Sequence, residues 1–199
     1  MSIQRSATPE LMDLDDFEEH LADKPAHEKW ELLGGRVIRM MVGARWSHNR
    51  IVNNINVALS QRLRGTGCFV YAETFALKDK FLRLMAYPDI MVHCGRPDPD
   101  DTSVSDPVVL FEVTSPGGEA RDRIVKADLY RRLPSLRHFV LVERDAALVT
   151  VDDLVGERTW TFGQELRGLD AVLPLPALGV ALPLAEIYRD VIEDGAGQA

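Results

Sequence analysis

The segment Val108–Thr114, with the sequence VVLFEVT, limits the fold of this chain more than any other stretch. A strand covered on one face alternates apolar and polar residues, whereas this segment is apolar on both of its alternating faces. It therefore predicts an inner strand of a sheet that helices cover on both sides, which places the chain in the α/β class. Glu112 is the only carboxylate in the segment. Its burial costs several kcal/mol unless a cation or hydrogen-bond donors meet it.

Length and composition predict one domain. The chain has 199 residues, of which 46% are hydrophobic, so we expect a single domain over 1–199 with flexible tails at 1–12 and 194–199. Neither a membrane-spanning segment nor a signal peptide is recognisable, which predicts a cytoplasmic protein without membrane contact. Cys68 and Cys94 lie far apart and form no CxxC motif, so we expect two thiols rather than a disulfide or a zinc site.

The net charge restricts how the protein can meet other molecules. The formal charge is −8, which is the wrong sign for a protein that grips nucleic acid with its whole surface. Basic residues nevertheless concentrate in 121–137, with the sequence RDRIVKADLYRRLPSLR. A local basic face therefore remains open.

Residue spacing predicts a mixed set of helices and strands. Helices are expected over 13–23, 47–64, 121–133 and 183–194, with Ser47 as the N-cap of the second. Strands are expected over 30–33, 36–41, 68–77, 80–85, 87–93, 107–114, 137–143, 147–154 and 157–162. The pair Gly34–Gly35 indicates a hairpin turn, and the polar segment 94–106 indicates a surface loop.

A second carboxylate suggests a partner for Glu112. Asp89 follows Pro88 at the start of a strand, and two strands can bring their carboxylates to one oxygen-lined site of the kind that binds Mg²⁺. The alternatives are an ion pair between Glu112 and a nearby arginine, and a turn role for Asp89. The ion pair is the usual arrangement for an isolated glutamate in a strand, and the turn role is about as common as any other for such an aspartate taken alone.

Lys126 is the third candidate. On the expected helix it shares a face with Asp122 and Tyr130. An Asp122–Lys126 pair on a solvated face would be worth only tenths of a kcal/mol. Lys126 also adjoins the apolar stripe of this helix, so it can point along the sheet toward Glu112.

Five segments in order resemble a known family. Between Trp30 and Glu143 they are WELLGG, SHNRIVNNINVAL, YPDIMV, LFEVTSPG and RDRIVKADLYRRL. They resemble the Uma-two family of restriction-endonuclease-like nucleases within the PD-(D/E)XK superfamily. Each motif alone is common, whereas the ordered set is considerably more specific. The resemblance implies a restriction-endonuclease-like fold, with a mixed central β-sheet flanked by α-helices.

The resemblance also assigns roles to residues. Asp89 and Glu112 match the metal ligands, and the main-chain carbonyl of Val113 would complete the coordination of Mg²⁺ or Mn²⁺. The lysine expected two residues after Glu112 is replaced by Thr114. Its role passes to Lys126 within the pattern D-x-x-x-K-x-x-x-Y.

Further residues match family positions. Glu31 matches an acid that would act as a second metal ligand or orient a water molecule. His48 would either contact substrate phosphate at a helix N-terminus or serve only in the capping turn. Ser115 would lie near the active site in the strand-to-helix turn, and Asp122 and Tyr130 are candidates for substrate binding.

The implied activity is that of a metal-dependent endonuclease that hydrolyses phosphodiester bonds, with DNA as the expected substrate. A Mg²⁺-activated water would attack the phosphate, and Lys126 would position or deprotonate it. A homodimer is expected, because two sites cut both strands of a duplex most easily. The alternative is a catalytically inactive nuclease fold used for dimerisation or partner binding, which the charge of −8 and Thr114 favour.

Overall fold

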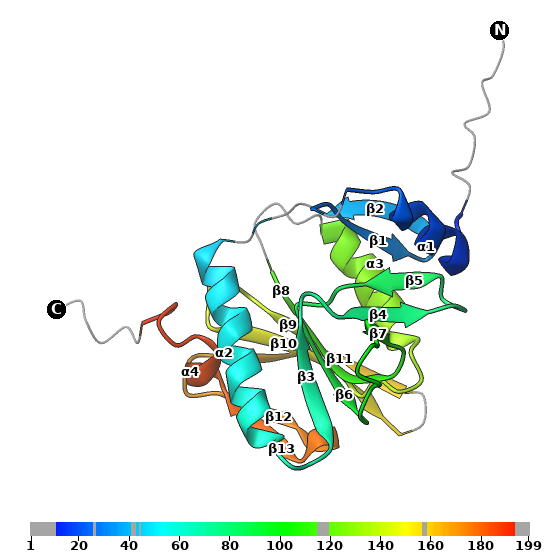
Figure 1. Ribbon diagram of the computed structural model, residues 1–199. Coiled ribbons are helices and arrows are strands. Elements are labelled where there is room, and N and C mark those ends of the chain that lie inside the picture. The colour runs from blue at the N-terminus through cyan, green and yellow to red at the C-terminus, as the bar shows by residue number, and fades with distance from the viewer. Residues whose placement is uncertain are drawn as a thin grey trace, which may run out of the picture.

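The computed structural model describes residues 11–25, 27–40, 43, 45–114, 120–156 and 159–193, and only the main chain of residues 120–123. Its strands form a six-stranded central sheet, a five-stranded second sheet and a two-stranded hairpin. Helices lie against these sheets, and α2 and α3 are on different sides of the central one (Figure 1).

The central sheet confirms the predicted mixed α/β architecture. Its strands, in the order β11-β10-β9-β8-β6-β3, are β3 (Cys68–Ala72), β6 (Ile90–Cys94), β8 (Pro107–Val113), β9 (His138–Val142), β10 (Leu148–Val155) and β11 (Thr159–Arg167). β8 and β9 are parallel, and the other neighbouring pairs are antiparallel. β8 is an inner strand, as its apolar sequence predicted.

One face of the central sheet packs against α2 and the C-terminal part of the chain. These elements are α2 (Trp46–Arg62), β12 (Val172–Leu175), the short 3₁₀ helix η1 (Pro176–Leu178), β13 (Val180–Pro183) and α4 (Leu184–Ile187). Ile55 and Leu59 of α2 and Phe111 of β8 are fully buried in this core. Each such side chain contributes about 1.5–3 kcal/mol through removal of its apolar surface from water.

The opposite face packs against α3 and the second sheet. These elements are α3 (Ala120–Arg131) and, in the order β2-β1-β5-β4-β7, the strands β1 (Lys29–Leu33), β2 (Arg36–Met40), β4 (Ala76–Asp79), β5 (Leu84–Ala86) and β7 (Ser103–Val104). Leu110 of β8 and Leu129 of α3 belong to the core between them. α1 (Leu14–Ala22) covers the second sheet through Phe17, and Asp13 caps it by accepting the N–H of Asp16 at 3.0 Å.

The second sheet was not predicted, and because of it the strand boundaries differ from the predicted ones. The stretch 68–77 is not one strand, because it leaves the central sheet after β3 and joins the second sheet as β4. The chain returns to the central sheet between β5 and β6, at 87–89. Both crossings lie beside Asp89.

Three smaller expectations are corrected. α2 begins at Trp46 with Arg45 as its N-cap, so Ser47 lies inside the helix and does not cap it. The C-terminal helix is limited to α4, and the chain after it turns through Asp190, whose φ is 64°. The expected surface loop 94–106 contains the short strand β7, which pairs with β4.

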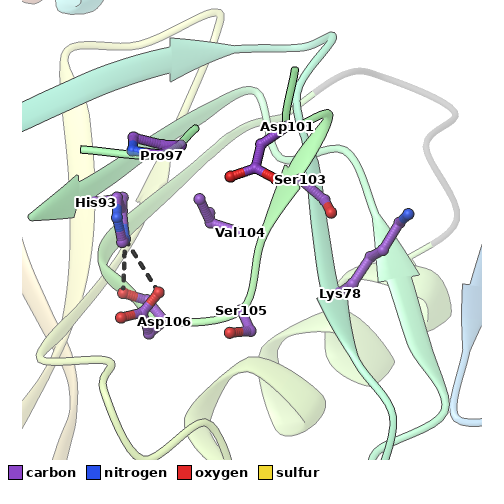
Figure 2. A pocket seen from close by; sticks show the side chains of 8 residues that line it. All are labelled: Lys78, His93, Pro97, Asp101, Ser103, Val104, Ser105 and Asp106. Carbon is purple, nitrogen blue, oxygen red and sulfur yellow. Dashed lines mark hydrogen bonds and ion pairs between the residues drawn. The ribbon is translucent and has the colours of Figure 1, made fainter. Parts of the chain in front are cut away.

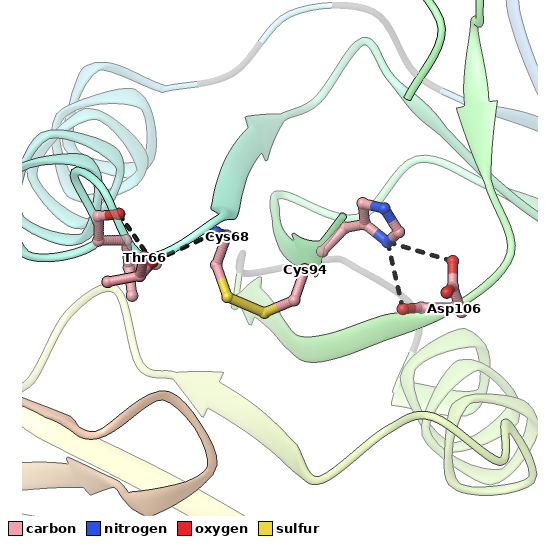
Figure 3. The surroundings of a disulfide bond; sticks show 6 residues. Thr66, Cys68, Cys94 and Asp106 are labelled. Carbon is pink, nitrogen blue, oxygen red and sulfur yellow. Dashed lines mark hydrogen bonds and ion pairs between the residues drawn. A yellow bond between two sulfur atoms is a disulfide. The ribbon is translucent and has the colours of Figure 1, made fainter. Parts of the chain in front are cut away.

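The prediction of two thiols is wrong, because Cys68 and Cys94 form a disulfide. They are direct register partners in the antiparallel pair β3–β6, and Figure 3 shows the bond joining the two strands. Sequence separation alone carries no information about that register, and this is why the pairing was missed.

A hollow of about 300 Å³ lies at the same end of β6. Its lining includes His93, whose Nδ1 is 3.1 Å from Oδ1 of Asp106, and Lys78 on the second sheet (Figure 2). None of its lining residues was predicted to be functional. Within the described ranges, no helix combines the length and the apolar character needed to cross a membrane.

The turn between β1 and β2 requires glycine at its second position, Gly35, and this requirement can be tested. Gly34 and Gly35 both have positive φ, 59° and 85°, as a two-residue hairpin turn of this kind requires. A Cβ on Gly35 would lie 3.0 Å from Cβ of Leu11 and 3.1 Å from the carbonyl oxygen of Met12, whereas on Gly34 the nearest atom would be 3.7 Å away. Gly35→Ala is therefore expected to lower the free energy of unfolding by about 2–3 kcal/mol.

Gly34→Ala is the matched control, because it keeps the strain of positive φ without the crowding. It should cost about 1–2 kcal/mol in the same urea titration. Equal losses in the two variants would show that the contact with the segment before α1 is unimportant.

Candidate functional site

Three carboxylates occupy one row across neighbouring strands. Ala72 pairs with Ile90, and Ile90 pairs with Phe111. Glu73 directly follows β3, Asp89 directly precedes β6, and Glu112 is the last but one residue of β8, so the three residues lie at matching ends of these strands. Because side chains alternate between faces, Glu112 lies opposite to Phe111 and faces α3 rather than α2.

Asp89 joins three parts of the fold. Its Oδ2 accepts the main-chain N–H of Val113 at 2.6 Å, which fixes it against the end of β8. The same oxygen lies 3.3 Å from Nε2 of His48, in the first turn of α2. This contact raises the pKa of His48, although burial opposes the shift. Nδ1 of His48 is buried and has no hydrogen-bond partner among the described residues.

Lys126 reaches the site from α3. Its Nζ lies 3.0 Å from Oε1 of Glu31 and 3.6 Å from Oε1 of Glu112. Oε1 of Glu31 also accepts the N–H of Tyr87 at 2.9 Å, and Glu31 is only 1% exposed. Tyr130, one turn after Lys126, is fully buried and donates its hydroxyl to Oε1 of Glu112 at 3.0 Å. The helix face of Lys126 and Tyr130 thus points toward Glu112.

Burial and neighbouring charges set the protonation of Glu112, Lys126 and Tyr130. Burial raises the pKa of Glu112 to about 7, helped by Asp89 and Glu31 and opposed by Lys126 and Tyr130. Burial by itself lowers the pKa of Lys126, but Glu112 and Glu31 outweigh it and hold that pKa above its ordinary value. Burial also raises the pKa of Tyr130 well above its ordinary value. Lys126 is therefore an ammonium, and Tyr130 a neutral donor, at physiological pH.

A second group of donors lies on the other side of Asp89. One ligand atom each from His48, Glu73 and Asp89 lie within 4.8 Å of one another. A histidine nitrogen with carboxylate oxygens is a donor set that suits a divalent metal ion. The carboxylates of Glu73 and Asp89 contact no lysine or arginine in the described part of the chain, so the positive charge of a cation fits here.

Sequence reasoning missed Glu73. A signal was present, because Glu73 is the only carboxylate in the otherwise β-rich stretch 68–77, as Glu112 is in its own strand. Its meaning depends on the register of β3 with β6, which the sequence does not reveal.

The other predicted positions have mixed outcomes. Thr114, which replaces the expected lysine, is buried and donates its hydroxyl to Glu143 at 2.7 Å, so it holds β8 to the end of β9. Val113 is the last residue of β8, next to Glu112. Ser115 and the side chain of Asp122 lie outside the described residues, and their proposed roles stay predictions.

The raised pKa of Glu112 predicts a stability difference that does not depend on activity. Its folded pKa of about 7 exceeds the ordinary 4.5, so ionising it destabilises the metal-free fold. This cost is absent below about pH 4.5, grows with pH, and is complete above about pH 7. In urea titrations with EDTA, Glu112→Gln should stabilise the protein by up to about 3 kcal/mol more at pH 8 than at low pH. An equal effect at pH 8 and pH 4 would contradict it.

Comparison with a solved structure supports the fold. A protein of Anabaena variabilis ATCC 29413, whose crystal structure is described as a "putative nuclease belonging to DUF820", superposes with a TM-score of 0.71. The match covers 91% of this chain and 99% of that one, at 14% sequence identity. The likeness shows that the two chains share their fold.

Sequence comparison finds relatives in Synechocystis sp. "Uncharacterized protein sll1609" is 28% identical over 75% of this chain and 85% of its own length. "Uncharacterized protein slr1290" is 25% identical over 86% of this chain and 90% of its own length. A family model described as "Putative restriction endonuclease" matches residues 14–185. With most of its length matched by that model, this chain belongs to the Uma2 family of restriction-endonuclease-like proteins.

Proposed function

We propose that this protein is a metal-dependent endonuclease that hydrolyses phosphodiester bonds in DNA. The observation that carries the proposal is the row Glu73–Asp89–Glu112 at the end of the central sheet, with Lys126 on one side and His48 on the other. Of the four carboxylates, counting Glu31, only Glu31 and Glu112 pair with a lysine, Lys126, among the described residues. This excess of negative charge suits a divalent cation, and the cation would in turn bind the substrate phosphate.

The metal ligands in this proposal are Asp89, Glu112 and the carbonyl of Val113, with Mg²⁺ or Mn²⁺ as the ion. When bound, the ion supplies Lewis-acid stabilisation of the phosphate oxygens and lowers the pKa of a water molecule. Asp89 is held for this task by the N–H of Val113. Tyr130 acts as a positioning residue, because its hydroxyl fixes Glu112 and its complete burial keeps it away from substrate.

Lys126 acts as a fixed positive charge. Glu112 and Glu31 hold its pKa above the ordinary value, which favours the role of a positive charge over that of the base that deprotonates the water. Its ammonium instead orients the nucleophile and offsets the negative charge of the transition state. Glu31, buried behind it, holds this ammonium in place through the 3.0 Å contact. We assign to Glu31 a positioning role rather than that of a metal ligand.

The test compares supercoiled plasmid, linear duplex, single-stranded DNA and RNA, each with Mg²⁺, Mn²⁺ or EDTA. We expect cleavage that requires the ion, with duplex DNA cut, and conversion of supercoiled plasmid to nicked and linear forms. Failure to cut any substrate, together with a melting temperature that neither ion shifts, would favour a catalytically inactive binding module.

Two further features belong to the proposal. Because the subunit carries a charge of −8 and two sites cut both strands of a duplex most easily, we propose that the active form is a homodimer. We also propose that the protein acts in the cytoplasm, where it would meet a DNA substrate. Sedimentation of the purified protein with and without duplex measures the first point.

A further inference from the structure

We propose that the site binds a second divalent cation between His48, Glu73 and Asp89, with Asp89 bridging the two ions, and that this position favours a transition-metal ion such as Mn²⁺ over Mg²⁺ or Ca²⁺. The inference rests on the proposed nuclease function, because Asp89 serves both positions. It adds Glu73 and His48 as ligands and gives the second position a metal preference.

The row of carboxylates gives Asp89 one carboxylate neighbour on each side. Glu73 follows β3, Asp89 precedes β6 and Glu112 lies in β8, at matching ends of three consecutive strands of the sheet, and neighbouring strands lie about 4.8 Å apart. Two-metal phosphodiesterase sites hold their ions about 3.5–4 Å apart. The middle carboxylate, Asp89, therefore has one neighbour for each ion.

The two positions differ in their counter-charge. On the Glu112 side, the ammonium of Lys126 lies 3.6 Å from the carboxylate. On the Glu73 side, His48 is the only basic side chain that meets either carboxylate within the ranges that the structure describes. The ammonium of Lys29 bonds the main-chain carbonyl of Glu73 rather than its carboxylate, so the carboxylates on the Glu73 side have the larger unmet demand for a cation.

The local backbone holds Glu73 in place. Its φ of 55° lies in the left-handed region, which costs a residue other than glycine about 1–3 kcal/mol. The N–H of Glu73 donates to the carbonyl of Pro88 at 3.2 Å, and Nζ of Lys29 donates to the carbonyl of Glu73 at 2.7 Å. These contacts keep the turn after β3 against the residue that precedes Asp89.

His48 is the reason why the second position should prefer a transition-metal ion. Mg²⁺ and Ca²⁺ favour sites made only of oxygen, whereas an imidazole nitrogen is a good ligand for first-row transition metals. Nε2 of His48 is the nitrogen that lies beside Asp89. The side chain is only 12% exposed, so few alternative orientations are open to it.

The experiment counts and identifies bound Mn²⁺ in the full-length protein. Calorimetric titration is expected to give two Mn²⁺ per chain for the wild type, and one for both Glu73→Gln and His48→Ala. Pulsed electron paramagnetic resonance should detect coupling of Mn²⁺ to an imidazole nitrogen in the wild type. That coupling should disappear in His48→Ala and persist in Glu112→Gln, which weakens only the other position. Mg²⁺ should fill one position at concentrations where Mn²⁺ fills both.

The controls distinguish failure of the second-cation proposal from failure of the nuclease proposal. Glu165→Gln, on the exposed edge strand β11, should bind Mn²⁺ as the wild type does, and equal melting temperatures in EDTA verify folding. One Mn²⁺ in the wild type, without nitrogen coupling and unchanged in Glu73→Gln, would overturn this inference and leave the nuclease proposal standing. No bound Mn²⁺ and no cleavage would overturn both.

Discussion

Asp89→Asn is expected to reduce metal-dependent DNA cleavage by at least about a thousandfold, which corresponds to about 4 kcal/mol of lost transition-state stabilisation. Asp89 is the middle carboxylate of the row and the only one proposed to contact both cations. Asparagine is isosteric and keeps an oxygen that can accept the N–H of Val113, which Asp89 now accepts at 2.6 Å. The fold should therefore survive the change.

The measurement is the initial rate of plasmid nicking at saturating Mg²⁺ and, separately, Mn²⁺. Asp106→Asn is the matched control, because Asp106 also lies beside a histidine, His93, at 3.1 Å, but at the opposite end of β6. It should cut at the wild-type rate. Cleavage by Asp89→Asn within tenfold of wild type would remove Asp89 from the mechanism.

Lys126→Met is expected to abolish cleavage and to lower the free energy of unfolding by about 3–5 kcal/mol, because it leaves buried carboxylates without their cation. Glu31 loses the ammonium at 3.0 Å and Glu112 the same group at 3.6 Å. Adding Glu31→Gln to Lys126→Met removes one of these charges. The double variant should recover part of the stability and none of the activity.

Chemical unfolding and plasmid cleavage of the single and double variants make up this test. Lys78→Met is the control, since Lys78 pairs with Glu18 at 2.6 Å on a more exposed surface and should change stability by at most about 1 kcal/mol. If Lys126→Met unfolds like the wild type, the buried ammonium does not neutralise the site. If it still cuts, Lys126 has no part in the chemistry.

The candidate residues that periodicity brought out of the sequence lie inside long regular elements. Glu112 was visible because a carboxylate interrupts an apolar strand, and Lys126 because it adjoins the apolar stripe of a helix. Both readings depend on periodicity within one element. The inner position of β8 and the hairpin at Gly34–Gly35 followed from equally local patterns.

The parts that were missed depend on how distant strands pair. Glu73 becomes a neighbour of Asp89, and Cys68 of Cys94, only once β3 is aligned with β6. The second sheet escaped notice because strands such as β5 and β7 are too short to show an alternating pattern. The prediction that Ser47 caps α2 was wrong, because this helix begins at Trp46 without any side-chain cap. A serine near the start of a helix therefore did not mark its first residue.

The Cys68–Cys94 bond gives this chain a covalent ring in addition to its fold. The ring spans a sequence separation of 26 and contains both Glu73 and Asp89. Closing a loop of this size removes conformational entropy from the unfolded chain that corresponds to about 3–4 kcal/mol. In the oxidised protein these two carboxylates therefore stay tethered to each other even when the sheet is lost, and reduction releases that tether.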